Sequence, residues 1–177
     1  MVVINKYLHQ YDFPVFSHLG KYIPELVNFY FDNIKNNKGS ANVEVENIKI
    51  NEFLIPHYLK ILNNNYQVGK TLGKIQSPAI YLQSSKDTIP EFHTHIDSSI
   101  LTFVFYLCLP DEGGGIEFNL PPKYSCKIQP QFDKLYVFPS YITHRPLGQI
   151  SKDLRISINW GYNANSRIVH KKSNMLW

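Results

Sequence analysis

Three features are scarce in this 177-residue sequence, and each scarcity excludes a class of protein. Two cysteines, Cys108 and Cys126, are too few for a disulfide framework; we expect buried free thiols and a cytoplasmic protein. No apolar run approaches the roughly 18 residues of a membrane span, and the apolar start is too short for a signal peptide. The 18 basic residues face 14 acidic ones without forming a basic block, so the charge pattern gives no indication of a nucleic-acid partner.

Hydrophobic and aromatic residues, by contrast, are abundant. They make up 44% and 14% of the chain, which is typical of a globular protein and favours a β-rich core. The length suits a single domain over residues 1–177. Within it we expect a mixed helical flank at 1–76, a β-rich core at 77–163 and a C-terminal tail at 164–177.

The N-terminal flank contains two helical patterns. Residues 21–37 repeat apolar residues at helical spacing, and we expect this stripe to pack against a sheet. The stripe consists of Ile23, Leu26, Val27, Tyr30, Phe31 and Ile34. A second helix is expected to begin near Pro56, a favourable first-turn residue, and to end near Val68. Between the two helices, residues 43–50 alternate in the manner of a strand.

From about residue 77 the sequence changes to short strands separated by turn residues, as in a sandwich or barrel. Strands are expected at residues 78–83, 100–109, 124–129 and 134–138. The strand at 100–109 is apolar on both faces, which indicates a central position. The glycine run at 113–115 predicts a turn, because glycine tolerates positive φ.

One short segment carries residues that suit a metal ion. His95 and Asp97 are two positions apart, so a strand would present both side chains on one face. With a histidine from elsewhere, such as His144, they would form the two-histidine, one-carboxylate set of non-haem iron enzymes, which leaves several positions open. A catalytic zinc site usually leaves one open position. His93 shares the same face, so His93 and His95 form an alternative ligand pair.

The strand expected after His144 would carry an inward-facing positive charge, that of Arg155. Residues 155–160 alternate polar and apolar residues, so Arg155, Ser157 and Asn159 share one face of a strand. An inward-facing arginine needs an anionic partner, and its guanidinium matches a carboxylate in two parallel hydrogen bonds. Adjacent antiparallel strands would place Arg155 and His144 in one cavity.

Four stretches, taken in order, resemble a known family. They read HIDSSILTFVFYL, GGGIEF, PQFDKLYVFPSYITHRP and LRISINW, and they span roughly residues 77–163. In this order and spacing they resemble the 2-oxoglutarate and iron(II)-dependent dioxygenase superfamily, in particular its prolyl-hydroxylase-like branch and the small oxygenases of bacteriophage genomes. The resemblance implies a mainly β fold: a double-stranded β-helix, or jelly roll, of about eight strands with flanking N-terminal α-helices.

The resemblance also implies roles for individual residues. His95, Asp97 and His144 would bind Fe(II), which favours Asp97 over His93 as the partner of His95. The residues implied for 2-oxoglutarate are Arg155 and Ser157 at its distal carboxylate, Tyr106 with a further hydroxyl, and Tyr81 beside them. His93, Asn159 and Arg145 would lie around the ligands or near a substrate, although a surface ion pair is the simpler interpretation of Arg145.

The activity implied is hydroxylation of an unactivated C–H bond, with O2 as cosubstrate and oxidative decarboxylation of 2-oxoglutarate. The substrate implied is a peptidyl proline or another amino-acid side chain. The alternatives are a hydroxylase of a free small metabolite, a cupin-like metalloenzyme that does not use 2-oxoglutarate, and a non-catalytic jelly-roll binding module. A viral origin would place the protein in the cytoplasm of the host cell.

Overall fold

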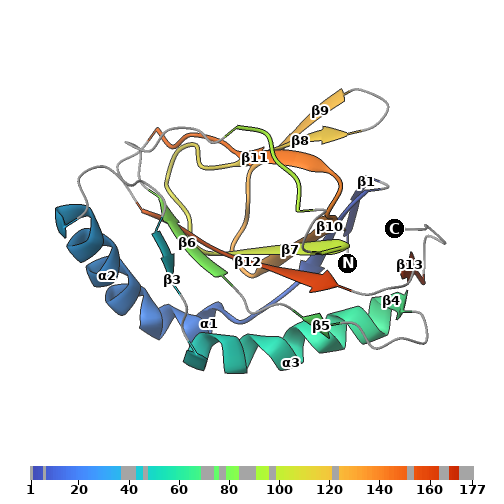
Figure 1. Cartoon of the computed structure of the whole chain (residues 1–177), viewed down its shortest axis with the longest axis horizontal. Helices are drawn as coiled ribbons and strands as arrows, with labels where there is room; N and C mark the ends of the chain where they lie inside the picture. Colours follow the sequence, from blue (N-terminus) through green and yellow to red (C-terminus); the bar gives the residue numbers. More distant parts are fainter. Residues whose placement is uncertain are drawn as a thin grey trace.

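Two β-sheets lie face to face, and the helices cover the outer side of the larger sheet (Figure 1). The computed structural model describes residues 2–5, 7–36, 43–45, 48–68, 74–75, 79–83, 91–95, 99–120, 124–150, 154–163 and 168–171. This arrangement confirms the mainly β fold with N-terminal helices that the sequence predicts.

The major sheet is antiparallel throughout, and β12 lies near its middle, between β7 and β6. Its strands run in the spatial order β1 (Val2–Asn5), β2 (Leu8–Asp12), β10 (Lys134–Pro139), β7 (Leu101–Cys108), β12 (Arg155–Asn163), β6 (Ala79–Gln83) and β3 (Val43–Val45), and β5 (Lys74–Ile75) also pairs with β12. The strands expected at 78–83, 100–109 and 134–138 are therefore confirmed.

The minor sheet faces the major sheet and consists of β11 (Thr143–Pro146), β8 (Ile116–Leu120) and β9 (Tyr124–Ile128). An isolated antiparallel bridge between His93 and His144 places residues 91–95 alongside β11. A separate two-stranded pair joins β4 (Tyr66–Val68) to β13 (Ile168–His170), so the segment expected as a tail contains a short strand.

The first helical region confirms the prediction for residues 21–37. A short α1 (Phe16–Leu19) and a 3-10 turn (Gly20–Tyr22) lead into α2 (Ile23–Asn36). Leu26 and Tyr30 are buried against the major sheet, as expected. Phe31, however, is 59% exposed, so the buried stripe is narrower than predicted.

The second helix differs from the prediction at its start. Helix α3 runs from Ile48 to Asn65 and contains Pro56 in its interior, so the predicted start at Pro56 was wrong. In the alternating segment, Val43–Val45 forms a strand and the residues from Ile48 onward belong to α3. An internal proline removes one helical hydrogen bond, but a buried apolar series with a four-residue repeat outweighs that loss: Ile50, Leu54, Tyr58 and Leu62.

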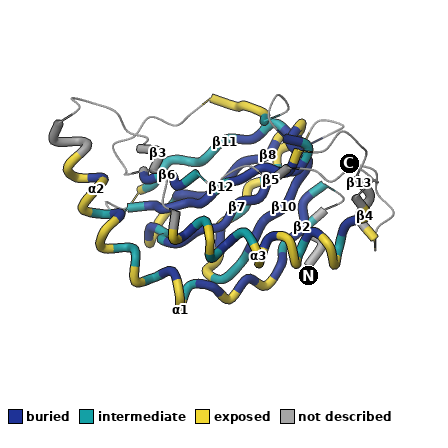
Figure 2. The backbone as a smooth tube through the Cα atoms, turned by 60° about the horizontal axis from the view of Figure 1, so that its bottom comes forward, coloured by how far each residue is buried: buried dark blue, intermediate teal, exposed yellow. Residues whose placement is uncertain are grey.

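The alternation of the central strands divides the interior into two cores. The tube view shows the middle of the major sheet buried, while α2 and α3 each bury only part of their surface (Figure 2). On β12, Ile156, Ile158 and Trp160 join the core beneath the helices. Arg155, Ser157 and Asn159 consequently face the space between the sheets, as their alternation predicts.

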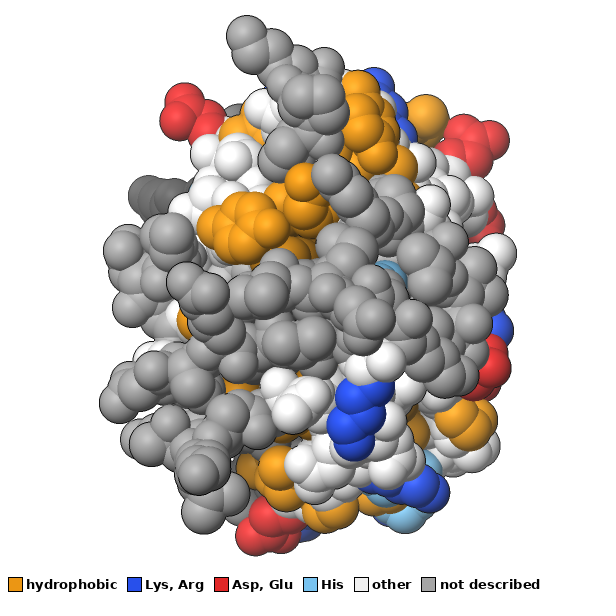
Figure 3. All heavy atoms as spheres, turned by 90° about the vertical axis from the view of Figure 1, so that its right-hand side faces the viewer, with side chains coloured by type: hydrophobic (Ala, Val, Ile, Leu, Met, Phe, Trp, Pro, Cys, Tyr) orange, Lys and Arg blue, Asp and Glu red, His pale blue; other side chains and the backbone are white. Residues whose placement is uncertain are grey.

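No helix within the described ranges combines the length and apolar character needed to cross a membrane. On the face drawn in Figure 3, basic side chains of described residues lie among acidic, apolar and uncharged ones without forming a continuous patch. Cys108 and Cys126 are both free, as expected, but they are half-buried rather than buried.

Candidate functional site

A cavity of about 160 Å³ lies between the two sheets. Its wall combines three histidines, one arginine, other polar side chains and a few apolar ones: Tyr81, His93, His95, Val104, Tyr106, Ile116, His144, Pro146, Arg155, Ser157 and Asn159. Most of the site residues expected from the sequence therefore meet at one place. Asp97 lies outside the described residues, and Arg145 does not line the cavity.

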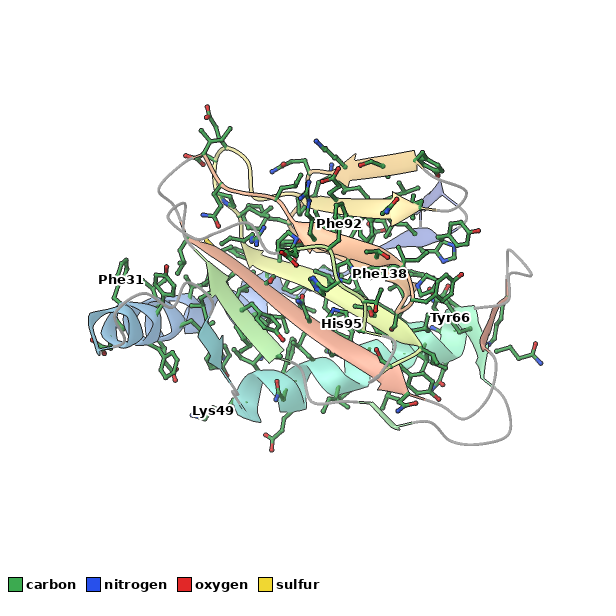
Figure 4. All side chains as sticks on the ribbon, turned by 45° about the horizontal axis from the view of Figure 1, so that its top comes forward. Phe31, Lys49, Tyr66, Phe92, His95 and Phe138 are labelled. Carbon is green, nitrogen blue, oxygen red and sulfur yellow. The ribbon has the colours of Figure 1, made fainter. Side chains whose placement is uncertain are left out.

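The three histidines form a compact group. Their nearest ring nitrogens all lie within 4.8 Å of one another. The ring centroids are 4.5 Å apart for His93 and His144, 5.0 Å for His93 and His95, and 5.1 Å for His95 and His144. Figure 4 shows His95 in the space between the sheets. Imidazole nitrogens at this separation suit a transition-metal ion such as iron, zinc or copper.

Backbone hydrogen bonds hold the histidines in place, although His95 does not lie in a strand. His93 and His144 exchange two N–H···O bonds of 3.0 Å, which set their side chains opposite each other. The His95 amide donates to Ser140 O at 3.0 Å, and the His95 carbonyl accepts from the Ser99 amide at 3.0 Å. Within the described residues 91–95, the strand pairing consists of the single bridge at His93.

The tautomer of His144 suits metal binding. Its Nδ1 lies 3.0 Å from the Ile142 carbonyl oxygen. A carbonyl oxygen only accepts, so Nδ1 carries the proton and Nε2 keeps its lone pair for a ligand. Burial lowers the pKa of His144 to about 3, with smaller effects of His93 and His95 in the same direction. His144 is therefore neutral at pH 7, as metal binding requires.

His95 is also held neutral. Burial lowers its pKa, and the neighbouring His93 lowers it further.

Next to the backbone of His95 lies a chain of buried hydroxyls that sequence reasoning missed. Ser140 Oγ is 2.8 Å from both Ser99 Oγ and Thr102 Oγ1. The position of Ser99 and Ser140, each four residues from a predicted histidine ligand, was the available signal.

Three hydroxyl-bearing residues form a row across the major sheet. Ser157 on β12 pairs with Tyr106 on β7 and with Tyr81 on β6, and all three line the cavity. Burial raises the pKa of Tyr106 to about 12, although nearby Arg155 opposes the shift. The Tyr106 phenol is therefore protonated at neutral pH and can donate a hydrogen bond to an anion.

Arg155 contributes a positive charge to the wall of the cavity. Its side chain is buried, and Nη1 donates to the carbonyl oxygens of Gly114 at 3.1 Å and Leu147 at 3.2 Å. Gly114 adopts a φ of +68°, and a Cβ there would lie 2.4 Å from Pro110 Cγ. The glycine turn thus brings backbone carbonyls close to the guanidinium. These bonds orient the guanidinium, whose planar N–H groups can match a carboxylate in two parallel hydrogen bonds.

Arg145 lies on the opposite face of β11 from His144, outside the cavity. Its Nη2 is 2.8 Å from Glu117 Oε2, and its Nε donates to the same oxygen at 2.9 Å. Ser125 donates to Glu117 Oε1 at 2.6 Å. These bonds from Ser125 and Arg145 hold the pKa of the Glu117 carboxyl below its usual value. The structure therefore supports the simpler interpretation of Arg145 as half of an ion pair.

Known proteins resemble this chain in fold rather than in sequence. No protein-family model matches the sequence, and no curated protein matches it significantly. A prolyl hydroxylase from Trichoplax adhaerens, solved with a peptide fragment of hypoxia-inducible factor, superposes with a TM-score of 0.68 at 15% identity, covering 90% of this chain and 84% of that one.

Two further solved structures are similar. A Pseudomonas putida prolyl-4-hydroxylase has a TM-score of 0.56 at 14% identity, covering 91% of this chain and 95% of that one. The α-ketoglutarate-dependent epimerase SnoN of nogalamycin biosynthesis has a TM-score of 0.59 at 11% identity, covering 92% and 79%. The chain therefore has the jelly-roll fold of the prolyl hydroxylases and other 2-oxoglutarate and iron(II)-dependent oxygenases, which confirms at the level of the fold the resemblance found in its sequence.

Proposed function

We propose that the protein is an Fe(II)- and 2-oxoglutarate-dependent oxygenase that hydroxylates an unactivated C–H bond. The observation that carries the proposal is the shared cavity, which joins a cluster of three imidazoles to a buried arginine and a row of hydroxyls. A non-catalytic module has no need for both features in one cavity. A cupin-like metalloenzyme would need the imidazoles but not Arg155.

His95 and His144 supply two of the metal ligands in this proposal. The third is Asp97 by the sequence pattern, and His93 is the alternative in the same cavity. The donor set fits iron, since imidazole nitrogens are ordinary ligands of Fe(II). Bound iron supplies the activation of O2 and the oxidation of the C–H bond, while the protein binds, orients and excludes water.

Arg155 and the hydroxyl row bind the dicarboxylate. The Arg155 guanidinium pairs with the distal carboxylate of 2-oxoglutarate, and Ser157 and Tyr106 donate hydrogen bonds to it. Tyr81, on the other side of Ser157, and Asn159, one pleat further along β12, complete the polar wall. Pockets for drug-sized ligands measure about 300–1,000 Å³, so a cavity of about 160 Å³ suits a small dicarboxylate.

The substrate in this proposal is a peptidyl proline or another amino-acid side chain. Similarity of fold to a prolyl hydroxylase that was solved with a peptide supports this choice. A free small molecule is the second candidate, which the likeness to an epimerase of nogalamycin biosynthesis supports. Both candidates require the substrate to reach the cavity between the sheets.

The test is release of succinate from 2-oxoglutarate in the presence of Fe(II), O2 and a panel of proline-containing peptides and small metabolites. We expect succinate from the parent protein, with hydroxylated product from one class of the panel. His144→Ala should abolish release, while His57→Ala, at an exposed position on α3, should match the parent. Equal release by the parent and His144→Ala, or no release by the parent, would contradict the proposal.

A further inference from the structure

Residues 91–95 extend the minor sheet beyond β11 by a short segment with an unpaired backbone edge. His93 and His144 each donate a 3.0 Å backbone bond to the carbonyl oxygen of the other. In an antiparallel pair, the backbone groups of successive residues point alternately towards and away from the neighbouring strand. Those of Phe92 and Thr94 consequently point away from β11. Within the described part of the chain, neither residue makes a backbone hydrogen bond.

This free edge is accessible and lies beside the cavity. Phe92 and Thr94 are both exposed, Phe92 to 39%. His93 and His95, which alternate with them, line the cavity. In Figure 4, His95 lies towards the major sheet and Phe92 away from it. The segment therefore borders the cavity with one face and the solvent with the other, and its backbone edge lies between the two.

The outer face of the segment is held in place by β11. The guanidinium carbon of Arg145 lies 4.4 Å from the centre of the Phe92 ring. Arg145 is in turn held by Glu117 on β8, at 2.8 Å. This cation–π contact and ion pair fix residues 92–93 against the minor sheet. An edge that is already fixed loses little conformational freedom when another strand pairs with it.

We propose that an extended peptide binds antiparallel to residues 92–94 as an added strand, and that this pairing makes the substrate a peptide rather than a free metabolite. This role rests on the proposed function for the chemistry in the cavity. The N–H and C=O groups of Phe92 and Thr94 are matched by another backbone, as in other cases of strand addition. Every strand pair in the described sheets is antiparallel, which favours the same direction for the peptide.

The pairing directs one peptide side chain into the cavity. Residues that lie opposite each other in a strand pair carry their side chains on the same face, with Cβ atoms about 4.5–5.5 Å apart. The peptide residue opposite His93 therefore points into the cavity, beside the imidazoles of His93 and His95. That residue is the one we expect to be hydroxylated.

Proline fits this central position. His93 directs its own N–H and C=O to β11, so the peptide residue opposite His93 directs its backbone groups away from the segment. Proline has no N–H and loses no hydrogen bond there, as at the edge of a sheet. It also keeps the residue before it extended. The two flanking peptide residues, by contrast, need their N–H groups for Phe92 and Thr94.

The test is amide hydrogen exchange of the protein loaded with Zn(II) and 2-oxoglutarate, measured by NMR with each proline-containing peptide of the panel. In the free protein, the Phe92 and Thr94 amides should exchange rapidly. A peptide at about nine times its Kd leaves about a tenth of the protein free, so both amides should exchange about 10-fold more slowly. The His93 amide, which donates to His144 O, is the internal control and should exchange slowly with and without peptide.

Methylation of single peptide nitrogens supplies the matched set of ligands. N-methylation of either residue next to the central proline should weaken binding by about 10-fold, because each of these N–H groups pairs with the edge. N-methylation two residues from the proline should change the affinity little, since those N–H groups point away from Phe92 and Thr94.

The outcomes separate this inference from the proposed function. Protection of Phe92 and Thr94 with alternating sensitivity to methylation supports strand addition, and if no succinate forms, only the oxygenase proposal fails. A peptide that releases succinate without protecting these amides would overturn strand addition and leave the oxygenase proposal standing. Turnover of a small metabolite alone would do the same, and so would a lack of protection by every peptide of the panel.

Discussion

Replacing Gly114 by alanine should lower both the stability of the protein and its affinity for 2-oxoglutarate. Gly114 adopts a φ of +68°, and an added Cβ would lie 2.4 Å from Pro110 Cγ and 3.6 Å from Arg155 Cδ. The left-handed backbone costs an alanine about 1–2 kcal/mol, and a forced clash in a packed site costs about 1–3 kcal/mol. We expect a total loss of about 2–5 kcal/mol in the free energy of unfolding.

The ligand effect follows from the carbonyl of the same residue. Gly114 O accepts a 3.1 Å hydrogen bond from Arg155 Nη1. Relief of the clash must therefore displace either Pro110 or the Gly114 carbonyl that holds the guanidinium. The affinity for 2-oxoglutarate should therefore fall in the folded variant, by about 10-fold for each 1.4 kcal/mol of weakened pairing.

Urea unfolding and calorimetric titration with 2-oxoglutarate in the presence of metal measure the two effects. Gly20→Ala is the matched control, because a Cβ there would meet only Phe16 ring carbons at 3.7 Å, an ordinary contact distance. It should keep the stability or raise it by up to about 1 kcal/mol, because Gly20 has a right-handed backbone that alanine adopts without strain. A Gly114→Ala protein as stable as Gly20→Ala would refute the reasoning about the turn.

Three further predictions concern the cavity. Arg155→Lys should weaken 2-oxoglutarate binding more than metal binding, because lysine keeps the charge but loses the bidentate match to a carboxylate. Calorimetric titrations with metal and with 2-oxoglutarate measure both affinities, and an unchanged affinity for 2-oxoglutarate would contradict the prediction. Ser140→Ala removes the hydroxyl partner of Thr102 and one partner of Ser99, so it should reduce the free energy of unfolding by about 1–3 kcal/mol. It should also reduce Co(II) affinity by about 10–100-fold. Unchanged Co(II) affinity would limit the hydroxyl chain to a structural role. Burial holds the pKa of His144 at about 3 in the metal-free protein, so the unfolded chain binds a proton at a higher pH than the folded protein does. The free energy of unfolding should therefore fall as the pH drops from about 6.5 towards 3, by up to about 1.4 kcal/mol per pH unit. In urea unfolding with chelator, the free energy of unfolding should change less steeply with pH for His144→Gln than for the parent.

The sequence predicts the polar wall of the cavity well, because strand alternation is a strong local constraint. Arg155, Ser157 and Asn159 had to share one face once residues 155–160 formed a strand, and the buried apolar face of β12 fixes which way they point. The meeting of Tyr106 and Tyr81 with Ser157 depends on register between distant strands. Only the family resemblance, not the spacing, could suggest that meeting.

Other features depend on long-range contacts that no local pattern reveals. Helix α3 continues through Pro56 because its apolar face packs on the major sheet, which overrides the preference of proline for a first turn. The pairing of His93 with His144 joins segments about fifty residues apart. The spacing places His93, His95 and Asp97 on one face equally, and it does not reveal the backbone bridge that sets His93 opposite His144.

The most direct test of the central claim, that metal and 2-oxoglutarate bind together in the cavity, is an anaerobic absorption titration. Fe(II) is added to the metal-free protein, followed by 2-oxoglutarate, and the visible charge-transfer band of a metal-chelated 2-oxo acid is recorded. The account predicts a band in the parent, no band in His144→Ala, and a band in Arg155→Ala that requires far more 2-oxoglutarate. Absence of the band from the parent, or identical titrations for the parent and Arg155→Ala, would contradict it.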